Sequence, residues 1–238
     1  MSKLGGKQVL NVFLKGNADL VDSLLPADDG GKLPGGLAGL LRDQYGAKYE
    51  AQLVHEPSGG SASLRDELAA ALAGSDRPPA TRLLEVGPDL IVFSLHAELL
   101  GAADSGTDPE VFTENMLRVI RLLKEQLEAH IIFLNASTIE PGQEISNYRG
   151  VEQEPFSIRA HRLDLALTEL SVREGISIID ADRLLAELGA AQHVMGPLDY
   201  SAVACEALCR ELLRVVEDYG FFEERPLVSQ VGQKQRIG

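Results

Sequence analysis

The sequence predicts a single-domain, doubly wound α/β/α sandwich around a mostly parallel five-stranded sheet. Short segments of the chain are apolar on both faces, as expected for strands of a parallel sheet that helices cover on both sides. Amphipathic stretches, most of them about 10 to 20 residues long, separate these segments and have the length of crossover helices. Polar, Gly-containing turns follow the apolar segments, at the strand ends where open parallel sheets bind ligands.

The apolar segments and the helical patterns alternate along the chain. The five expected strands are residues 8–14, 49–54, 89–95, 131–135 and 176–180. The six expected helices are residues 19–25, 37–45, 61–73, 109–129, 156–174 and 201–219. A strand, a helix and a second parallel strand form a right-handed unit in nearly all known cases, so the chain is expected to wind in one sense.

Length and composition indicate one large domain over residues 1–224, followed by a tail over residues 225–238. The chain has 238 residues, of which 45% are hydrophobic and 24% charged, as in ordinary globular domains. The tail has no periodicity, which predicts an extended or disordered segment, or an arm that docks on a partner subunit. A formal net charge of -14 argues against nucleic acid or an anionic membrane as partner.

The first nine residues contain no apolar run of signal-peptide length, and no stretch reaches the roughly 20 apolar residues that cross a bilayer. We therefore expect a cytoplasmic protein. Cys205 and Cys209 lie four residues apart on a predicted helix, where parallel Cβ directions suit a disulfide poorly. A reduced, half-buried pair is favoured. Residues 26–36 and 138–155 are predicted to form a flexible loop and a long polar loop.

Most candidate site residues follow the expected strands, and Asp199 and Tyr200 precede the last expected helix. The candidates are Lys15, Gly16, Asn17, Asp19, Ser58, Gly59, Gly60, His96, Glu98, Asn135, Ser137, Asp199 and Tyr200. Backbone N–H groups in the turn after the first strand are suited to an anion or a developing oxyanion, with Asn17 or Asp19 as helix cap. The alternative is a plain strand-to-helix turn. The glycine-rich turn after the second strand allows the same two interpretations, with Ser61 as an N-cap. Asp199 or Ser201 is a candidate N-cap for the last helix.

The segment His96-Ala97-Glu98 matches the H-x-E element of zinc nucleobase deaminases. Those enzymes also need a Pro-Cys-x-x-Cys pair to hold zinc, whereas three residues separate Cys205 from Cys209 and no proline precedes them. A zinc site of His96, Cys205 and Cys209 is therefore disfavoured against a polar pocket histidine. We predict neither a metal nor a cofactor.

Three blocks, in order, resemble the SGNH (GDSL-type) hydrolases over residues 9–216. The first is a strand and turn that ends in Gly16-Asn17-Ala18, where the family has Gly-Asp-Ser. The second, Pro88 to Leu95, is similar to the family's "PDLVVxxLG" strand. The third, Gly196 to Ser201, is similar to "DGxHYS" before a long helix. The resemblance implies the SGNH/flavodoxin-like sandwich.

Carried over position by position, the resemblance implies that the catalytic residues are replaced. Ala18 stands at the nucleophile position and has no oxygen for attack. His96 and Glu98 stand where the family has the Gly and Asn of its oxyanion block, and Gly196 and Asp199 where it has the Asp and His of its last block. Within this resemblance, only glycine support for an oxyanion, from Gly59 or Gly60, is retained. Carboxylates at two of these positions would oppose an acyl-transfer transition state.

Three functional hypotheses follow. The first is a pseudoenzyme that acts as a binding or accessory subunit, with a protein partner or a second copy of itself, and with a small-molecule ligand at the strand ends as a further option. The second is an active esterase or acyltransferase with a relocated nucleophile. Its candidate serines are Ser23, Ser58, Ser94 and Ser137, and its candidate bases are His55 and His96. The third is a diverged enzyme that uses His96, Glu98 and Asp199 for acid–base or metal chemistry, or that binds a cation or an amine with the help of Lys15.

Overall fold

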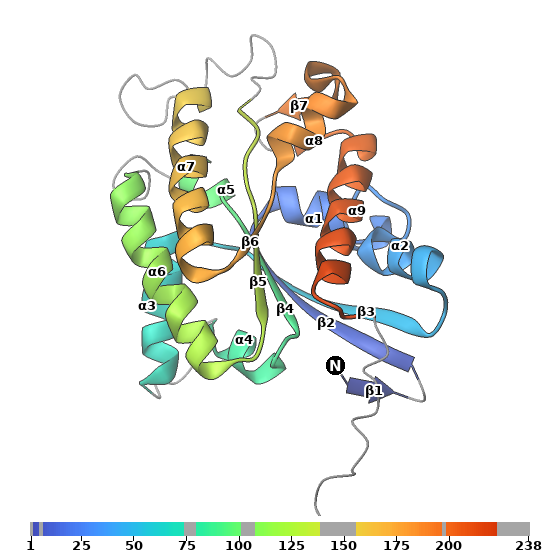
Figure 1. The fold of residues 1–238 in the computed structure, drawn as a ribbon, viewed down its shortest axis with the longest axis horizontal. Coiled ribbons are helices and arrows are strands. Elements are labelled where there is room, and N and C mark those ends of the chain that lie inside the picture. The colour runs from blue at the N-terminus through green and yellow to red at the C-terminus, as the bar shows by residue number, and fades with distance from the viewer. Residues whose placement is uncertain are drawn as a thin grey trace, which may run out of the picture.

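The computed structural model describes residues 2–4, 7–73, 80–100, 108–138, 156–196 and 199–222. These residues form three layers, with a twisted sheet between two sets of helices (Figure 1). The doubly wound α/β/α prediction is confirmed. The predicted tail and almost all of the predicted loop over residues 138–155 lie outside the described residues.

Five strands run parallel in the order β3-β2-β4-β5-β6. They are β2 (Lys7–Lys15), β3 (Tyr49–Glu56), β4 (Leu90–Ser94), β5 (His130–Leu134) and β6 (Ser177–Ile179). Each matches an expected strand within a few residues; β2, β4 and β5 are apolar on both faces, whereas the edge strand β3 alternates buried and exposed residues at its start. The order changes direction at β2 and β4, and the carboxyl ends of strands at such a switch point are where open parallel sheets bind ligands.

Three short strands have no counterpart among the predictions. β1 (Ser2–Leu4) pairs antiparallel with the start of β2, and β7 (Val194–Gly196) pairs antiparallel with β8 (Asp199–Tyr200). Segments of two or three residues are too short to show a period of two in the sequence. Their pairing depends on the tertiary structure.

Helices cover both faces of the sheet (Figure 1). One face carries α3 (Ser61–Leu72), α6 (Pro109–Gln126) and α7 (Phe156–Glu174). The other carries α1 (Ala18–Leu24), α2 (Gly36–Tyr45), α8 (Ala181–Leu188) and α9 (Ala202–Asp218). The helices α4 (Ala80–Val86), α5 (His96–Leu100) and α8 are absent from the predictions, and each has eight residues or fewer.

The segment 26–36 differs from the flexible loop that was predicted. It contains a 3-10 turn, η1 (Ala27–Asp29), and the backbone N–H of Lys32 donates to the carbonyl of Asp22 at 2.9 Å. The Lys32 ammonium also contacts Asp22 and Asp199. The loop is therefore anchored at Lys32, next to the last block of the resemblance.

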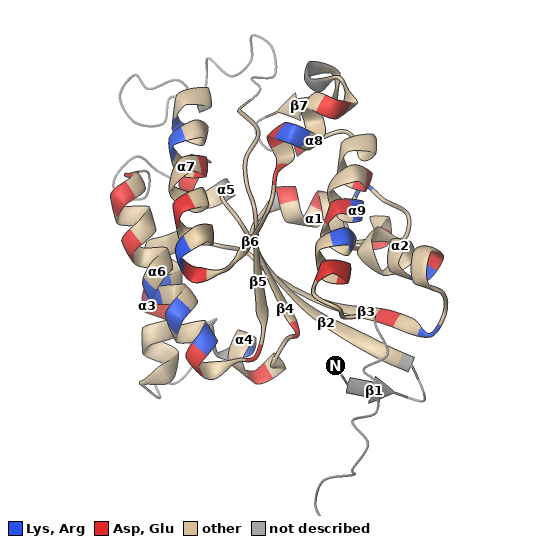
Figure 2. Cartoon of the chain, viewed as in Figure 1, with Lys and Arg blue, Asp and Glu red and all other residues tan. Residues whose placement is uncertain are grey.

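Apolar strand residues fill the core between the layers. Val12, Phe13 and Leu14 of β2 are fully buried, and the rings of Phe93 and Phe133 on neighbouring strands lie 5.0 Å apart. Charged residues lie mainly on the helices and at strand ends, with acidic and basic residues interspersed (Figure 2). In the described ranges, no helix has both the length and the apolar character that crossing a membrane requires.

Cys205 and Cys209 on α9 are reduced, as predicted, but they are fully buried rather than half-buried. Burial against α1 is the cause: the Ser23 hydroxyl donates to the Cys205 sulfur at 3.7 Å. Burial raises the pKa of Cys205, and it raises the pKa of Cys209 to about 12.

We expect both thiols to resist alkylation in the native protein. At pH 8 a thiol of pKa about 12 has roughly a thousandfold less thiolate than a free cysteine. The measurement is the rate of mass increase after a maleimide is added, compared between the native protein and glutathione. Two additions should appear promptly only in denaturant, and fast labelling of the native protein would contradict the buried positions.

Candidate functional site

The turn after β2 is fixed by close packing. A Cβ atom added to Gly16 would lie 2.5 Å from Leu20 Cδ1 and 2.6 Å from Ser94 Oγ, so only glycine fits without a shift. The Gly16 N–H donates to the Glu56 carbonyl at 3.1 Å, and His55 Nε2 contacts the Gly16 carbonyl at 3.0 Å. Gly16 therefore joins the carboxyl ends of β2, β3 and β4, and its own N–H is already bonded.

Asn17 and Asp19 hold this turn to the neighbouring strands. Asn17 is the N-cap residue of α1, but its side chain makes no capping bond. Instead its amide donates to the Ser58 carbonyl and accepts from the Ser58 N–H, both at 3.3 Å. The buried Asp19 accepts from the Ser94 hydroxyl at 3.1 Å. Asn17 therefore has the predicted N-cap position, but its side chain bonds to the turn after β3 instead of capping the helix. Ala18 begins α1, and its side chain lies outside the described residues.

Glu98 occupies the N-terminus of α3. Its side chain is 3% exposed, and its Oε1 accepts the Ser61 N–H in the first turn of that helix. A Cβ on Gly60 would lie 3.1 Å from this oxygen, and Gly60 has a φ of +97°, so glycine suits the position on both counts. Gly60 is therefore the N-cap residue of α3, in place of the predicted Ser61. Gly59 precedes it in the described turn.

The carboxyl of Glu98 is poorly solvated. Its Oε2 is buried and has no hydrogen-bond partner in the described residues. Burial raises the pKa of Glu98, and the hydrogen bonds from Ser61 act in the opposite direction. In either protonation state an oxygen of Glu98 accepts the Ser61 N–H. The first turn of α3 therefore already holds an internal carboxyl group where it would otherwise attract an anion.

Lys15 is held away from the crevice by two carboxylates. Its ammonium is 3% exposed and lies 3.5 Å from Glu56 Oε2 and 3.2 Å from Glu67 Oε2. Glu67 is held in turn by the Ser63 hydroxyl at 2.8 Å. This cluster ties the end of β2 to α3, with one ammonium shared by two carboxylates.

Asp199 forms an ion pair with Lys32 at the position where the resemblance places a histidine. The Lys32 ammonium contacts Asp199 Oδ1, lies 2.9 Å from Asp22 Oδ2, and donates to the Tyr200 carbonyl at 2.6 Å. Although partial burial alone would lower it, the pKa of Lys32 is raised by its bonds to Asp199 and Asp22. About half of the Asp199 side chain is exposed. Gly196 lies in β7 beside it.

Beyond β5, Asn135 and Ser137 connect the sheet to α8. The Asn135 side chain accepts the Ala181 N–H at 2.6 Å. The Ser137 hydroxyl donates to Asp182 at 3.0 Å, and the Ser137 N–H donates to the buried Tyr200 hydroxyl at 3.3 Å. Burial, followed by the nearby Asp19 carboxylate, raises the pKa of Tyr200, so this phenol is neutral and acts as an acceptor.

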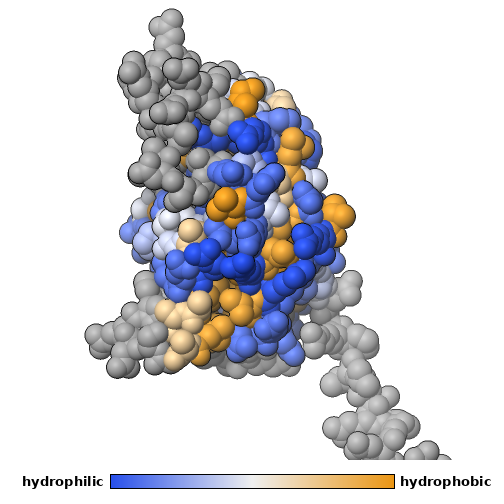
Figure 3. All heavy atoms as spheres, turned by 90° about the vertical axis from the view of Figure 1, so that its left-hand side faces the viewer, coloured by the Kyte–Doolittle hydropathy of each residue, from blue (hydrophilic) through white to orange (hydrophobic). Residues whose placement is uncertain are grey.

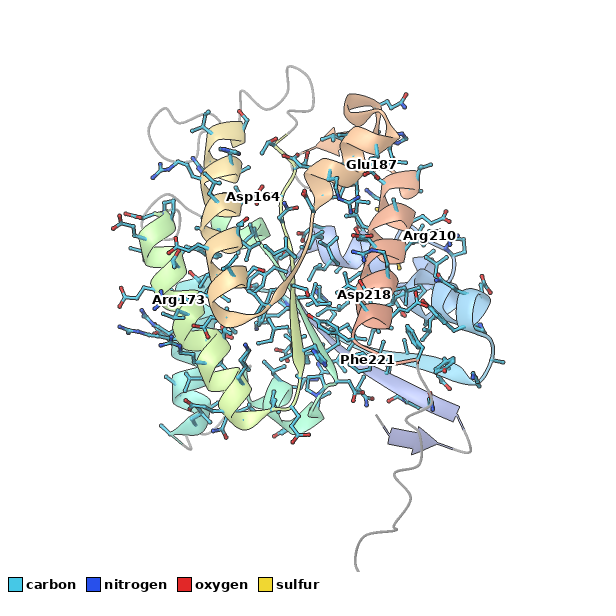
Figure 4. The ribbon with its side chains drawn as sticks, viewed as in Figure 1. Asp164, Arg173, Glu187, Arg210, Asp218 and Phe221 are labelled. Atoms are coloured by element: carbon cyan, nitrogen blue, oxygen red, sulfur yellow. The ribbon has the colours of Figure 1, made fainter. Side chains whose placement is uncertain are left out.

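Sequence reasoning missed Asp164, which α7 places near the same residues (Figure 4 labels it). Burial, and to a smaller extent the carboxylates of Asp182 and Asp180, raise the pKa of Asp164 to about 8. Its Oδ1 is buried and has no hydrogen-bond partner in the described residues. The carboxyl group of Asp164 is therefore mainly neutral at pH 7. An acidic residue next to the buried Leu163 on an amphipathic helix was the only signal in the sequence.

The serines proposed as relocated nucleophiles bond to groups other than histidine in the contacts described. Ser23 donates to Cys205, Ser94 to Asp19 and Ser137 to Asp182, and Ser58 Oγ accepts the Gly60 N–H. A Ser–His hydrogen bond does occur elsewhere, between His193 Nδ1 and Ser201 Oγ at 2.8 Å. Ser201 is also the predicted N-cap of α9, and it accepts the Ala204 N–H at 3.3 Å. This pair was not among the candidates.

Two residues of the metal hypothesis, Glu98 and Asp199, have separate partners in the structure. Glu98 bonds to Ser61, and Asp199 bonds to Lys32. Within the described ranges, no group of three or more His, Cys, Asp or Glu side chains could hold a metal ion. His96 begins α5, and its side chain is not described.

The parallel five-stranded sheet between two layers of helices matches the fold of solved SGNH/GDSL hydrolases. Comparison with protein-family models and with curated proteins gave no match. Solved structures do match. A catalytic mutant of an acetylxylan esterase from Geobacillus stearothermophilus has a TM-score of 0.57 at 16% identity, over 90% of this chain and 95% of that one. A GDSL-like lipase from Parabacteroides merdae has a TM-score of 0.59 at 13% identity, over 91% and 99%. TesA has a TM-score of 0.53 at 17% identity, over 87% and 98%.

Proposed function

We propose that this protein is a catalytically degenerate SGNH-fold protein that acts as a binding or accessory subunit. The observation that carries the proposal is the hydrogen bond from the Ser61 N–H to the Glu98 carboxyl. Acyl transfer needs N–H donors that are open to an oxyanion. Here a donor at the carboxyl end of the sheet is already bonded inside the protein.

Electrostatic magnitudes favour the same proposal. Two negative charges about 4 Å apart repel by roughly 4 kcal/mol at an effective dielectric constant of about 20. One oxyanion-hole donor contributes about 3 to 4 kcal/mol to catalysis. An ionised Glu98 would therefore cancel the gain from a donor, and a protonated Glu98 would still occupy the Ser61 N–H.

The remaining catalytic positions support the proposal. Asp199, at the histidine position, is paired with Lys32 and would be a weak base for a hydroxyl group. Ala18, at the nucleophile position, has no hydroxyl. Asn17, Asp19 and Lys15 are bonded to neighbouring strands, turns or helices, which supports a structural role for this turn. A protein or small-molecule partner is the proposed target of the carboxyl-end crevice.

We expect no covalent adduct when the purified protein is treated with a fluorophosphonate probe, with intact mass as the measurement. An active SGNH esterase labelled in parallel is the control for the probe. The variant Glu98→Asn, which restores the residue type of the family's oxyanion block, should also stay unlabelled because Ala18 remains. A stoichiometric adduct would overturn the proposal, and peptide mapping would then identify the nucleophile, with Ser201 beside His193 as the first position to test.

A further inference from the structure

Helix α7 carries an exposed apolar stripe on the side opposite its core face. Ile158, Leu165 and Val172 are 51%, 58% and 85% exposed, and they follow one another at intervals of seven residues. Seven residues are nearly two helical turns, so the three side chains lie in one row. The core-facing residues of the same helix, including Leu163, Leu167 and Leu170, are fully buried. The core of this domain therefore does not account for the stripe.

The stripe borders a groove between α7 and α6. The groove has a volume of about 580 Å³, and Leu117, Leu165 and Ala166 contribute its apolar lining. Figure 3 views this side of the molecule and shows separate apolar side chains among hydrophilic ones. An apolar row with a polar border is typical of a surface that pairs with another helix.

Two of the charged residues beside the stripe have a self-complementary order, and Arg173 on α7 and Glu110 and Glu114 on α6 also line the groove. Arg162 and Glu169 are both exposed, line the groove and are also seven residues apart. They flank Leu165 at nearly equal distances along the helix, with Arg162 on the N-terminal side and Glu169 on the C-terminal side. Rotation about a two-fold axis through Leu165 would place Arg162 of each copy opposite Glu169 of the other. It would also place Ile158 opposite Val172.

We propose that α7 is a self-association surface on which a second copy of this chain packs antiparallel, centred on Leu165. A parallel pairing would oppose Arg162 to Arg162 and Glu169 to Glu169, and like charges at such positions disfavour an interface. The net charge of -14 also opposes association of two copies, so the pairing should be strongest where salt screens long-range repulsion but close ion pairs persist. This inference rests on α7 alone and does not depend on whether the carboxyl-end site is catalytic.

Sedimentation velocity of the full chain over a wide concentration range, at physiological ionic strength, tests the proposal. We expect a reversible dimer. Leu165→Glu should weaken it by about tenfold or more, because two carboxylates would meet at the two-fold axis. Val203→Glu is the matched control, since Val203 is similarly exposed (54%) but lies on α9. All the substituted residues are exposed, and unchanged thermal unfolding should confirm that each variant folds.

Charge exchange and cross-linking test the orientation. Arg162→Glu and Glu169→Arg should each weaken the dimer, and the double variant should recover it. A mixture of Ile158→Cys and Val172→Cys proteins should form mixed disulfides faster than either variant alone, and the buried native cysteines should not interfere. A wild-type protein that is monomeric throughout, a dimer unaffected by Leu165→Glu, or preferential cross-linking of like with like would each overturn the proposal. A fluorophosphonate adduct would overturn only the proposed function.

Discussion

Asp164→Asn is expected to stabilise the folded protein at pH 8 and to leave its stability near pH 4 almost unchanged. The folded-state pKa of Asp164 is raised to about 8 by burial, against an ordinary value of 3.8. Between these values the folded protein keeps a proton that the unfolded chain has lost. The wild type therefore loses stability as pH rises, at up to about 1.4 kcal/mol per pH unit for this one group. Asparagine has no such proton, and the gain at pH 8 should be on the order of 2 to 5 kcal/mol.

Urea unfolding of wild type and variant at pH 4, 6 and 8 measures this difference, because other titrating groups cancel in the comparison. Asp182→Asn is the comparison variant, and its expected change in the free energy of unfolding has the opposite sign. Asp182 accepts three hydrogen bonds, from the Ser137 hydroxyl and from the N–H and hydroxyl of Thr138. Its substitution should destabilise the protein by about 1 to 3 kcal/mol. Parallel pH profiles for wild type and Asp164→Asn would show that Asp164 is ionised in the folded protein.

Lys15→Met is expected to destabilise the protein by about 3 to 5 kcal/mol at pH 7. The ammonium of Lys15 compensates Glu56 and Glu67, and all three residues lie between β2, β3 and α3. Methionine fills a similar volume, so the cost measures two carboxylates left without their cation rather than a cavity. The free energy of unfolding, from urea titration at constant m-value, is the measurement.

Two further variants make the Lys15 result specific. Lys32→Met removes a lysine that is about 29% exposed in its own ion-pair cluster, and it should cost less than Lys15→Met because solvent screens those charges. Adding Glu56→Gln to Lys15→Met should recover part of the loss, since one uncompensated charge is removed. Equal costs for the two lysines, or no recovery in the double variant, would mean that the charges of the Lys15 cluster do not control its stability.

Local patterns determined much of the fold. The apolar runs of β2, β4 and β5 and the long periods of α6, α7 and α9 are recognisable without any long-range information, and the structure reproduces them within a few residues. The replacement of serine by Ala18 is likewise a property of the sequence alone. The short helices α4, α5 and α8 were not predicted, although α8 has a clear amphipathic pattern after its Asp180 N-cap; helices of about two turns depend on packing for their stability.

The tertiary structure alone decided the chemistry of the candidate site. The sequence places Lys15, Asn17, Glu98 and Asp199 near strand ends, but it does not say which group each one contacts. Lys15 pairs with a glutamate 52 positions away, and Lys32 with an aspartate 167 positions away. Hydrogen bonds and burial depend on atoms brought together within about 3 Å by the whole fold, whereas helices and strands depend on neighbours along the chain. The raised pKa of Asp164 and the bonded carboxyl of Glu98 are therefore consequences of folding, and residue type and spacing do not encode them.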